Sequence, residues 1–109
     1  MQPPDRGDLV YVNFNPQSGH EQAGRRPGIV LSPKAFNQST GFAVLCPITR
    51  QKKGYPFEVE LPGGSAVEGV ILADQVKSLD WRSRQLQIIG RAPNEIVSDC
   101  LDLIHTFLT

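Results

Sequence analysis

Two adjacent arginines, Arg25 and Arg26, are the residues of this sequence whose types and spacing best suit chemistry on a phosphate group. They follow Gly24 and lead through a proline into the apolar run 29–31, so a fixed positive charge stands where a polar loop enters a strand. A guanidinium group offers a planar fork that matches two phosphate oxygens and stays charged near neutral pH. The segment therefore predicts a phosphate-binding site.

Charge is distributed unevenly along this chain of 109 residues, whose formal net charge is zero. The span 25–53 holds six basic residues and no acidic residue, whereas residues 93–109 hold three acidic residues and no lysine or arginine. The six are Arg25, Arg26, Lys34, Arg50, Lys52 and Lys53. A basic region within a neutral protein favours contact with nucleic-acid phosphates, although a solvated face with chance clustering would have the same composition.

The sequence has few of the ligands that catalytic metal ions need. Such sites use three or more His, Cys or carboxylate side chains at workable spacing, and this chain has two histidines and two cysteines, all far apart. It also lacks the G-x-S-x-G, Walker and G-x-G-x-x-G motifs. We therefore expect a reaction without a metal ion or another cofactor, and we expect His20 and His105 to be solvated.

The length predicts one domain, residues 1–109, with a modest core. Cys46 and Cys100 each stand in an apolar run, which indicates buried, unpaired thiols. The start of the chain is polar, and no apolar run approaches the length that spans a bilayer. We expect a cytoplasmic protein that does not bind membranes.

Apolar patterning predicts several short strands. Residues 9–14 and 57–61 alternate apolar with polar side chains, as in strands with one face exposed to water, whereas 42–48 is a continuous apolar run. The predicted strands cover residues 9–14, 29–31, 42–48, 57–61, 70–79 and 86–89. A short helix or turn is expected between Pro33 and Gly41.

The carboxyl-terminal segment shows helical spacing instead. Its apolar residues fall on one arc of roughly 160°. They are Ile96, Val97, Cys100, Leu101, Leu103, Ile104, Phe107 and Leu108. Pro93 suits the first helical position and Glu95 the positive first turn. The expected fold class is mainly β (α+β): five to seven short strands closed into a small barrel, with one terminal helix packed on it.

Several short motifs are spread along the chain. They are E-Q-A-G-x-R-P at 21–27, I-V-L-S-P at 29–33, P-I-T at 47–49, K-G-Y-P-F-E-V at 53–59, A-D-Q-V-K-S at 73–78 and W-R at 81–82. In content and order they resemble the MazF/PemK (Kid) family of toxin endoribonucleases. The resemblance implies an SH3-like barrel of the CcdB/MazF type, a homodimer, and metal-independent, sequence-selective cleavage of single-stranded RNA.

The resemblance also implies roles for particular residues. Arg26 and Thr49 match the catalytic arginine and threonine of the family. Cleavage by the 2′-hydroxyl of RNA needs a proton acceptor, a proton donor and stabilisation of negative charge. Arginine is a poor acid near neutral pH, so we expect Arg26 to stabilise charge. Glu21 is the first candidate for the proton acceptor and Asp74 its rival, although Glu21 could instead order its loop through backbone N–H groups.

Further residues are expected to hold the RNA. Basic side chains would follow the backbone of a single strand, and an aromatic ring would stack on a base. The predicted RNA-binding residues are Arg25, Arg50, Lys52, Lys53, Tyr55, Asp74 and Lys77. Phe57 alternates with glutamates and is expected in the core, so Tyr55 is the stacking candidate.

The resemblance further implies a cognate, MazE-like antitoxin whose acidic tail lies along the toxin dimer. Because charge pairs alone are screened, we expect part of that binding to be hydrophobic, with an apolar residue of the tail beside Tyr55 or Trp81. One alternative is a non-enzymatic poison that binds a protein target, as CcdB toxins bind DNA gyrase. Against it, Phe107 belongs to the apolar arc of the terminal helix rather than to a free aromatic tail. A second alternative, a catalytically inactive SH3-like binding module, would not need both Arg26 and Thr49.

Overall fold

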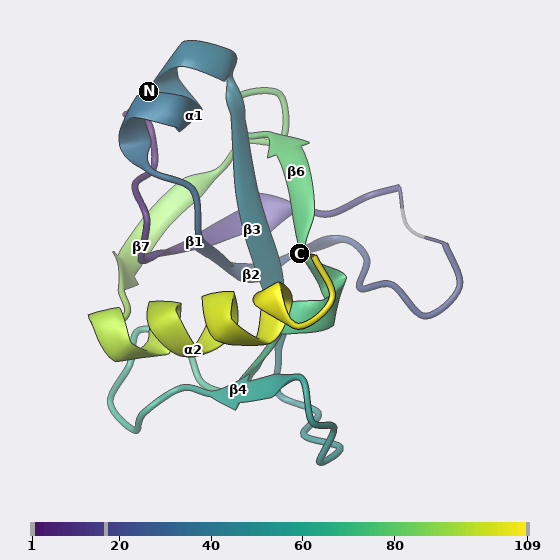
Figure 1. Cartoon of the computed structure of the whole chain (residues 1–109). Helices are drawn as coiled ribbons and strands as arrows, with labels where there is room; N and C mark the ends of the chain where they lie inside the picture. Colours follow the sequence, from purple (N-terminus) through teal and green to yellow (C-terminus); the bar gives the residue numbers. More distant parts are fainter. Residues whose placement is uncertain (1, 17, 109) are drawn as a thin grey trace.

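The computed structural model describes residues 2–16 and 18–108. Within them, seven strands form an antiparallel, strongly curved sheet, and one helix lies across its open end (Figure 1). The strands are β1 (Asp8–Asn13), β2 (Arg25–Val30), β3 (Phe42–Thr49), β4 (Glu58–Glu60), β5 (Val70–Leu72), β6 (Lys77–Asp80) and β7 (Gln87–Arg91). The helices are α1 (Lys34–Thr40), the 3₁₀ turn η1 (Ala73–Gln75) and α2 (Asn94–His105).

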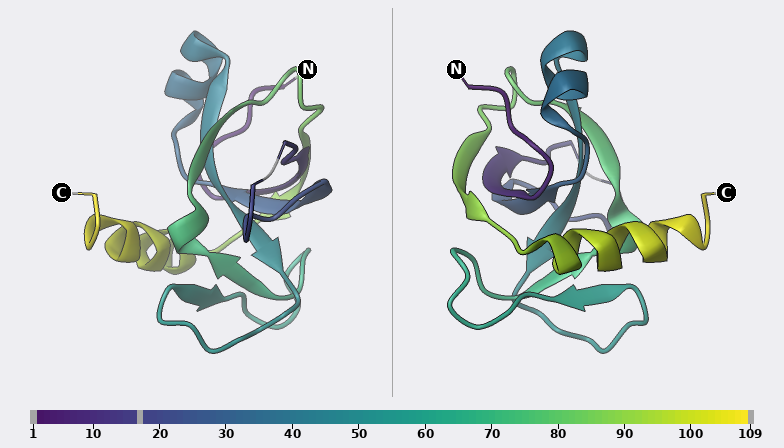
Figure 2. Two further views of the ribbon diagram at one scale, coloured as in Figure 1. Left: turned by 90° about the vertical axis from the view of Figure 1, so that its right-hand side faces the viewer. Right: turned by 60° about the vertical axis from the view of Figure 1, so that its left-hand side comes forward.

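Strand β3 connects the two parts of the sheet. The strand order is β4-β5-β3-β2-β1-β7, and β6 also pairs with β3. The first half of β3 pairs with β6 and its last two residues, Ile48 and Thr49, pair with β5. The two views of Figure 2 show the sheet curling into an open barrel with α2 packed beside β4 and η1. The predicted fold class, a small mainly-β barrel with a carboxyl-terminal helix, is confirmed.

Two apolar layers stabilise the sheet, because successive residues of a strand point to opposite faces. One layer lies inside the curl and includes Val12, Val30, Leu45 and Trp81. The other layer lies between the sheet and α2. It includes Leu9, Ile29, Cys46, Ile48, Val97 and Cys100. Both cysteines are buried and free, as predicted.

A buried polar cluster fixes α1 to the barrel. The Asn37 side chain donates to the carbonyl oxygens of Pro4 (2.8 Å) and Ser32 (3.0 Å), and the Trp81 indole donates to the Asn37 carbonyl (2.9 Å). The Ser32 hydroxyl accepts a hydrogen bond from the Val44 amide (2.8 Å). Since Asn37 and Trp81 are fully buried, these bonds satisfy groups that would otherwise be costly to bury.

The structure differs from the sequence predictions in several places; β2, for example, begins at Arg25 and not at residue 29. The predicted strand 70–79 is interrupted by η1, which turns the chain from β5 to β6 and carries Asp74 and Gln75 on the surface. Pro93 precedes the terminal helix instead of forming its first residue, because its ψ of 150° is extended.

The apolar arc of the terminal helix is only partly covered. The helix ends at His105, so Phe107 lies beyond it and meets Phe57 edge to face with ring centroids 5.7 Å apart. Leu101 and Leu108 remain 37% and 64% exposed. In residues 2–16 and 18–108, every helix is too short or too polar to cross a bilayer.

Candidate functional site

Arg26 and Thr49 stand on the paired strands β2 and β3 and line the same surface hollow. Strands β2 and β3 are antiparallel, with Gly28 opposite Pro47. The pairing of β2 with β3 ends at this pair, and Arg26 and Thr49 lie two residues beyond it, at the adjoining ends of the two strands. The two residues that the family resemblance selected, 23 positions apart in sequence, are therefore brought together by strand pairing.

A surface hollow, here called the arginine hollow, contains both side chains. Its floor is formed by β2 and the end of β3, and the loop between β4 and β5 closes one side. The lining residues are Tyr11, Arg26, Pro27, Ile48, Thr49, Arg50 and 65–68. Arg26 is half-buried, and its Nε donates to the Ala23 carbonyl (2.9 Å). That bond fixes the guanidinium group while its terminal nitrogens remain available for an anion.

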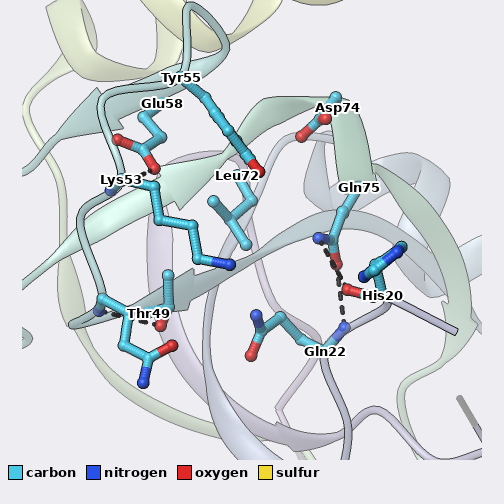
Figure 3. A pocket seen from close by; sticks show the side chains of 10 residues that line it. His20, Gln22, Thr49, Lys53, Tyr55, Glu58, Leu72, Asp74 and Gln75 are labelled. Atoms are coloured by element: carbon cyan, nitrogen blue, oxygen red, sulfur yellow. Dashed lines mark hydrogen bonds between the residues drawn. The ribbon is translucent and has the colours of Figure 1, made fainter.

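A second hollow, the tyrosine hollow, shares Thr49 with the first. Figure 3 shows the side chains that line it. Its lining residues are His20, Gln22, Thr49, Gln51, Lys53, Tyr55, Glu58, Leu72, Asp74 and Gln75. The Lys53 ammonium lies 6.0 Å from the centre of the Tyr55 ring, which is 56% exposed. An exposed ring beside a cation suits the stacking of a nucleobase next to a phosphate.

Hydrogen bonds from backbone amides to side-chain oxygens fix the conformation of the loop after β3. The carboxylate of Glu58 accepts from the amides of Lys53 and Gly54, both at 3.0 Å, and Gly54 has a positive φ of 79°. The Thr49 hydroxyl accepts from the Gln51 amide at 3.2 Å. Because the hydroxyl is the acceptor in this bond, its own proton remains available for donation to a substrate.

The other wall of the tyrosine hollow comes from the loop between β1 and β2. The side-chain amide of Gln75 accepts from the Gln22 amide (3.0 Å) and donates to the His20 carbonyl (3.5 Å). Both bonds are drawn in Figure 3, where the Gln75 side chain reaches from η1 to the backbone of this loop. His20 is exposed, as expected, yet it lines the hollow.

Glu21, predicted as the proton acceptor, lines neither hollow. Its carboxylate accepts from the Ser18 amide (2.9 Å) and lies 3.4 Å from the Lys77 ammonium. The Ser18 amide, and then Lys77, hold the pKa of Glu21 below its usual value. A carboxylate with a lowered pKa is a weaker base, so its surroundings favour the alternative in which Glu21 orders its loop.

Three of the predicted RNA-binding residues also lie outside the two hollows. Arg25 points away from Arg26, and its guanidinium donates to the Gln85 carbonyl (2.8 Å) and the Gln87 side chain (3.3 Å). Lys52 is exposed and pairs with Glu60 at 2.7 Å. Lys77, the third, is the partner of Glu21. By contrast, the remaining candidates line a hollow: Arg50 in the first and Lys53, Tyr55 and Asp74 in the second.

Sequence reasoning missed Gln22, Gln75 and Glu68 as residues of these hollows. Both glutamines stand inside motifs that carry the family resemblance, but a glutamine has no signal of its own that points to a site. Glu68 follows a glycine-containing loop without any recognisable motif. In the described ranges 2–16 and 18–108, no three His, Cys, Asp or Glu side chains are grouped as a metal ion would require.

Comparison with known proteins gives one consistent family. Residues 5–108 match the model of the family described as PemK-like, MazF-like toxin of type II toxin-antitoxin system. The chain is 53% identical over 94 residues to the endoribonuclease toxin MazF of Escherichia coli K12, which covers 85% of this chain and 84% of that protein.

Solved structures agree with this family. The chain superposes on a crystal structure of MazF from Deinococcus radiodurans with a TM-score of 0.95 and 49% identity, covering 99% of this chain and 98% of that one. It also matches a MazE-MazF structure from the same organism with a TM-score of 0.87 and 50% identity, over 96% of this chain and 95% of that one.

Proposed function

The chain belongs to the family of PemK-like, MazF-like toxins of type II toxin-antitoxin systems, and we propose that it is a metal-independent, sequence-selective endoribonuclease that cuts single-stranded mRNA. The observation that carries this proposal is that Arg26 and Thr49, on the paired strands β2 and β3, line one hollow. The names of the relatives, endoribonucleases from Escherichia coli among them, support the same activity.

In the proposed reaction, the 2′-hydroxyl of one nucleotide loses its proton and attacks the adjacent phosphorus. The bond from phosphorus to the 5′-oxygen breaks, the leaving oxygen takes up a proton from a protein donor or from water, and the products are a 2′,3′-cyclic phosphate and a 5′-hydroxyl. Negative charge builds up on the non-bridging oxygens in the transition state, where Arg26 supplies positive charge and Thr49 a hydrogen bond. Both groups are fixed by strand positions and need little reorganisation.

The proton acceptor is best sought among carboxylates beside Thr49. Asp74 lines the tyrosine hollow together with Thr49, whereas Glu21 lines neither hollow and is bound to Ser18 and Lys77. We therefore favour Asp74 over Glu21 for this role. General bases typically contribute about 10²–10⁴-fold to a rate, so the choice between the two is measurable.

The two hollows suggest a path for the RNA strand. Arg50 would contact a phosphate next to Arg26, and Lys53 a phosphate on the other side of Thr49. The exposed ring of Tyr55 would stack on the base that enters the tyrosine hollow. Lys52 is next to Lys53 in sequence and would contact the RNA farther from Thr49, although its ammonium is paired with Glu60.

A cognate antitoxin with an acidic tail is the proposed protein partner, because solved relatives include MazE-MazF complexes. We further propose a homodimer in the cytoplasm. The tail would lie over the two hollows, and an apolar residue of the tail would pack beside Tyr55. Trp81, the other neighbour considered for this residue from the sequence, is fully buried and cannot serve. The CcdB-like alternative, a non-enzymatic poison of gyrase, lacks support from relatives that are named endoribonucleases.

The proposal is tested by cutting a defined single-stranded RNA in the presence of EDTA and analysing the ends. We expect cleavage to persist and to give cyclic-phosphate and 5′-hydroxyl ends. Arg26→Ala is the negative control, because a contaminating nuclease would still cut. Loss of activity in EDTA, or 5′-phosphate products, would contradict the proposed chemistry.

A further inference from the structure

The loop between β1 and β2 is bound to the η1–β6 segment by two side chains that reach across the surface. Gln75 uses both ends of its amide, accepting from the Gln22 amide (3.0 Å) and donating to the His20 carbonyl (3.5 Å). Two residues later, Lys77 lies 3.4 Å from the Glu21 carboxylate. The bonded residues are separated by 53–56 positions in sequence. We call this set of contacts the loop latch.

The loop latch determines where one wall of the tyrosine hollow stands. His20 and Gln22 line that hollow, and the latch binds the backbone of both residues rather than their side chains. The side chain of Gln22 is thereby left free to face the hollow, as Figure 3 shows. Without the latch, a polar loop that contains Gly19 and Gly24, both at positive φ, would have little else to fix its distance from η1.

We propose that Gln75, Lys77 and Glu21 are positioning residues for RNA cleavage: together they hold residues 20–22 as a wall of the tyrosine hollow, and Glu21 acts through Lys77 instead of on the RNA. This inference rests on the endoribonuclease activity proposed for the chain. It assigns a role in substrate binding to a glutamine that sequence reasoning did not select, and it moves Glu21 and Lys77 out of direct contact with the substrate.

The geometry at Glu21 supports this assignment. Oε1 of its carboxylate accepts from the Ser18 amide at 2.9 Å while the Ser18 carbonyl accepts from the Glu21 amide at 3.2 Å, so the residue closes a tight turn of its own loop. The Lys77 side chain is only 17% exposed. A lysine with a mostly covered stem and a carboxylate 3.4 Å from its ammonium is held in place, which suits an attachment point for the loop.

The first experiment separates a positioning residue from a proton acceptor. Glu21→Gln keeps an oxygen that can accept from the Ser18 amide but removes the charge that attracts Lys77. If Glu21 is a positioning residue, kcat/KM for a defined RNA falls by about two- to tenfold, the size expected for one net hydrogen bond. If Glu21 were the proton acceptor, kcat would fall by roughly 10²–10⁴-fold, and the acidic limb of the pH profile would be lost.

A double-mutant cycle tests whether Glu21 acts through Lys77. Lys77→Met removes the ammonium and keeps most of the covered stem. We expect Lys77→Met to reduce kcat/KM as much as Glu21→Gln, and the double variant to be no worse than either, because the two changes break the same contact. Additive losses would mean that the two residues act separately and would overturn this part of the inference.

Gln75 is tested by its effect on substrate binding. Gln75→Ala should raise KM by about two- to tenfold and change kcat much less. The wall of the hollow would move, whereas Arg26 and Thr49 would stay on their strands. Gln75→Glu can still accept from the Gln22 amide but cannot donate to the His20 carbonyl, and we expect an intermediate KM. Gln38→Ala, an exposed glutamine on α1, is the matched control and should behave as the unaltered protein.

The outcomes distinguish this inference from the proposed function. The unaltered protein must cut RNA and Arg26→Ala must not; if that fails, the endoribonuclease proposal is wrong. If both hold while Gln75→Ala leaves KM unchanged with the fold intact by circular dichroism, the latch has no role in binding RNA. If Glu21→Gln lowered kcat by roughly a hundredfold or more with KM unchanged, Glu21 would be assigned as the proton acceptor after all.

Discussion

Gly69 lies directly against the backbone of Thr49: a Cβ atom at Gly69 would overlap the Thr49 carbonyl oxygen and stand 2.9 Å from its carbonyl carbon. Gly69 also has a φ of +129°, a conformation that residues with a side chain rarely adopt. It immediately precedes Val70, the partner of Thr49 in the pairing of β3 with β5. The position of the candidate catalytic threonine thus depends on a glycine that lines neither hollow.

The first prediction concerns this contact. Gly69→Ala should destabilise the protein by about 1–3 kcal/mol, the usual cost of a strained backbone conformation, and should also lower kcat because Thr49 must move. Urea unfolding and RNA cleavage assays measure the two effects. Gly63→Ala in the same loop is the control, since its Cβ would have no neighbour within 4 Å. Equal behaviour of the two variants would show that Gly69 does not position Thr49.

The second prediction concerns Arg26 and Thr49. Arg26→Ala and Thr49→Ala should each lower kcat by about 10²–10³-fold, corresponding to roughly 2.7–4 kcal/mol, because each removes a group that stabilises the transition state. Arg25→Ala, next in sequence but turned toward Gln85 and Gln87, should lose much less. Single-turnover cleavage of a short RNA measures the rates. An Arg26→Ala protein that cuts at the normal rate would disprove the assignment.

The third prediction uses salt to count phosphate contacts. Each phosphate bound on a single strand contributes a slope of about −0.7 in log affinity against log salt concentration. In a Thr49→Ala background, which keeps every charge, Lys53→Ala should flatten the slope by about that amount because Lys53 lines the tyrosine hollow. Lys52→Ala should change it less, since Glu60 already holds Lys52. Fluorescence anisotropy gives the affinities, and Lys34→Ala on α1 is the control. If Lys53→Ala left the salt slope unchanged, Lys53 would not contact a phosphate.

The fourth prediction concerns the two buried thiols. Burial raises the pKa of Cys46, and raises the pKa of Cys100 to about 12. Above about pH 9 the thiols of the unfolded chain ionise and those of the folded chain do not, so the free energy of unfolding should fall as pH rises through that range. Urea titrations at a series of pH values measure this loss.

The control for this prediction is Cys100→Ala, which removes one of the two thiols and should reduce the pH dependence. At neutral pH both thiols should be inert to a disulfide reagent until the protein unfolds. Rapid labelling of the folded protein would contradict the buried positions of both residues.

The fifth prediction concerns the antitoxin. An acidic tail that covers Arg26, Arg50 and Lys53 should compete with RNA, and its inhibition should weaken as salt rises because exposed charges are screened. Tyr55→Ala should weaken antitoxin binding more than Lys52→Ala does, since the exposed ring is where the apolar anchor residue of the tail is proposed to pack. Binding of RNA by the Thr49→Ala protein at rising antitoxin concentration is the measurement. A ternary complex with unchanged RNA affinity would place the antitoxin elsewhere.

Local pattern was enough to predict the strands and the terminal helix, because the period of apolar residues depends on each element's own geometry. It failed at residues 70–79, where a continuous β-favouring sequence is broken by η1. That break is imposed by tertiary structure, since β5 and β6 pair with opposite ends of β3 and the chain must turn between them.

The site could be predicted only as far as residue types and family motifs allow. The closeness of Arg26 to Thr49 follows from the pairing of β2 with β3 once the strands are known. The partner of Glu21 could not be predicted, because Lys77 is 56 residues away in sequence and belongs to a different motif. For the same reason Gln75 carried no signal, since its role depends on bonds to the backbone of a distant loop.

The division of the site between strands and loops has a consequence for how such a protein can diversify. Arg26 and Thr49 stand on hydrogen-bonded strands, whereas His20, Gln22, Lys53 and Tyr55 stand on the loops that wall the second hollow. Mutations, insertions and exchanges in those loops can reshape the surface proposed to meet the RNA without displacing Arg26 and Thr49. Under the proposed function, selection could therefore change the target of this barrel while the proposed reaction is retained.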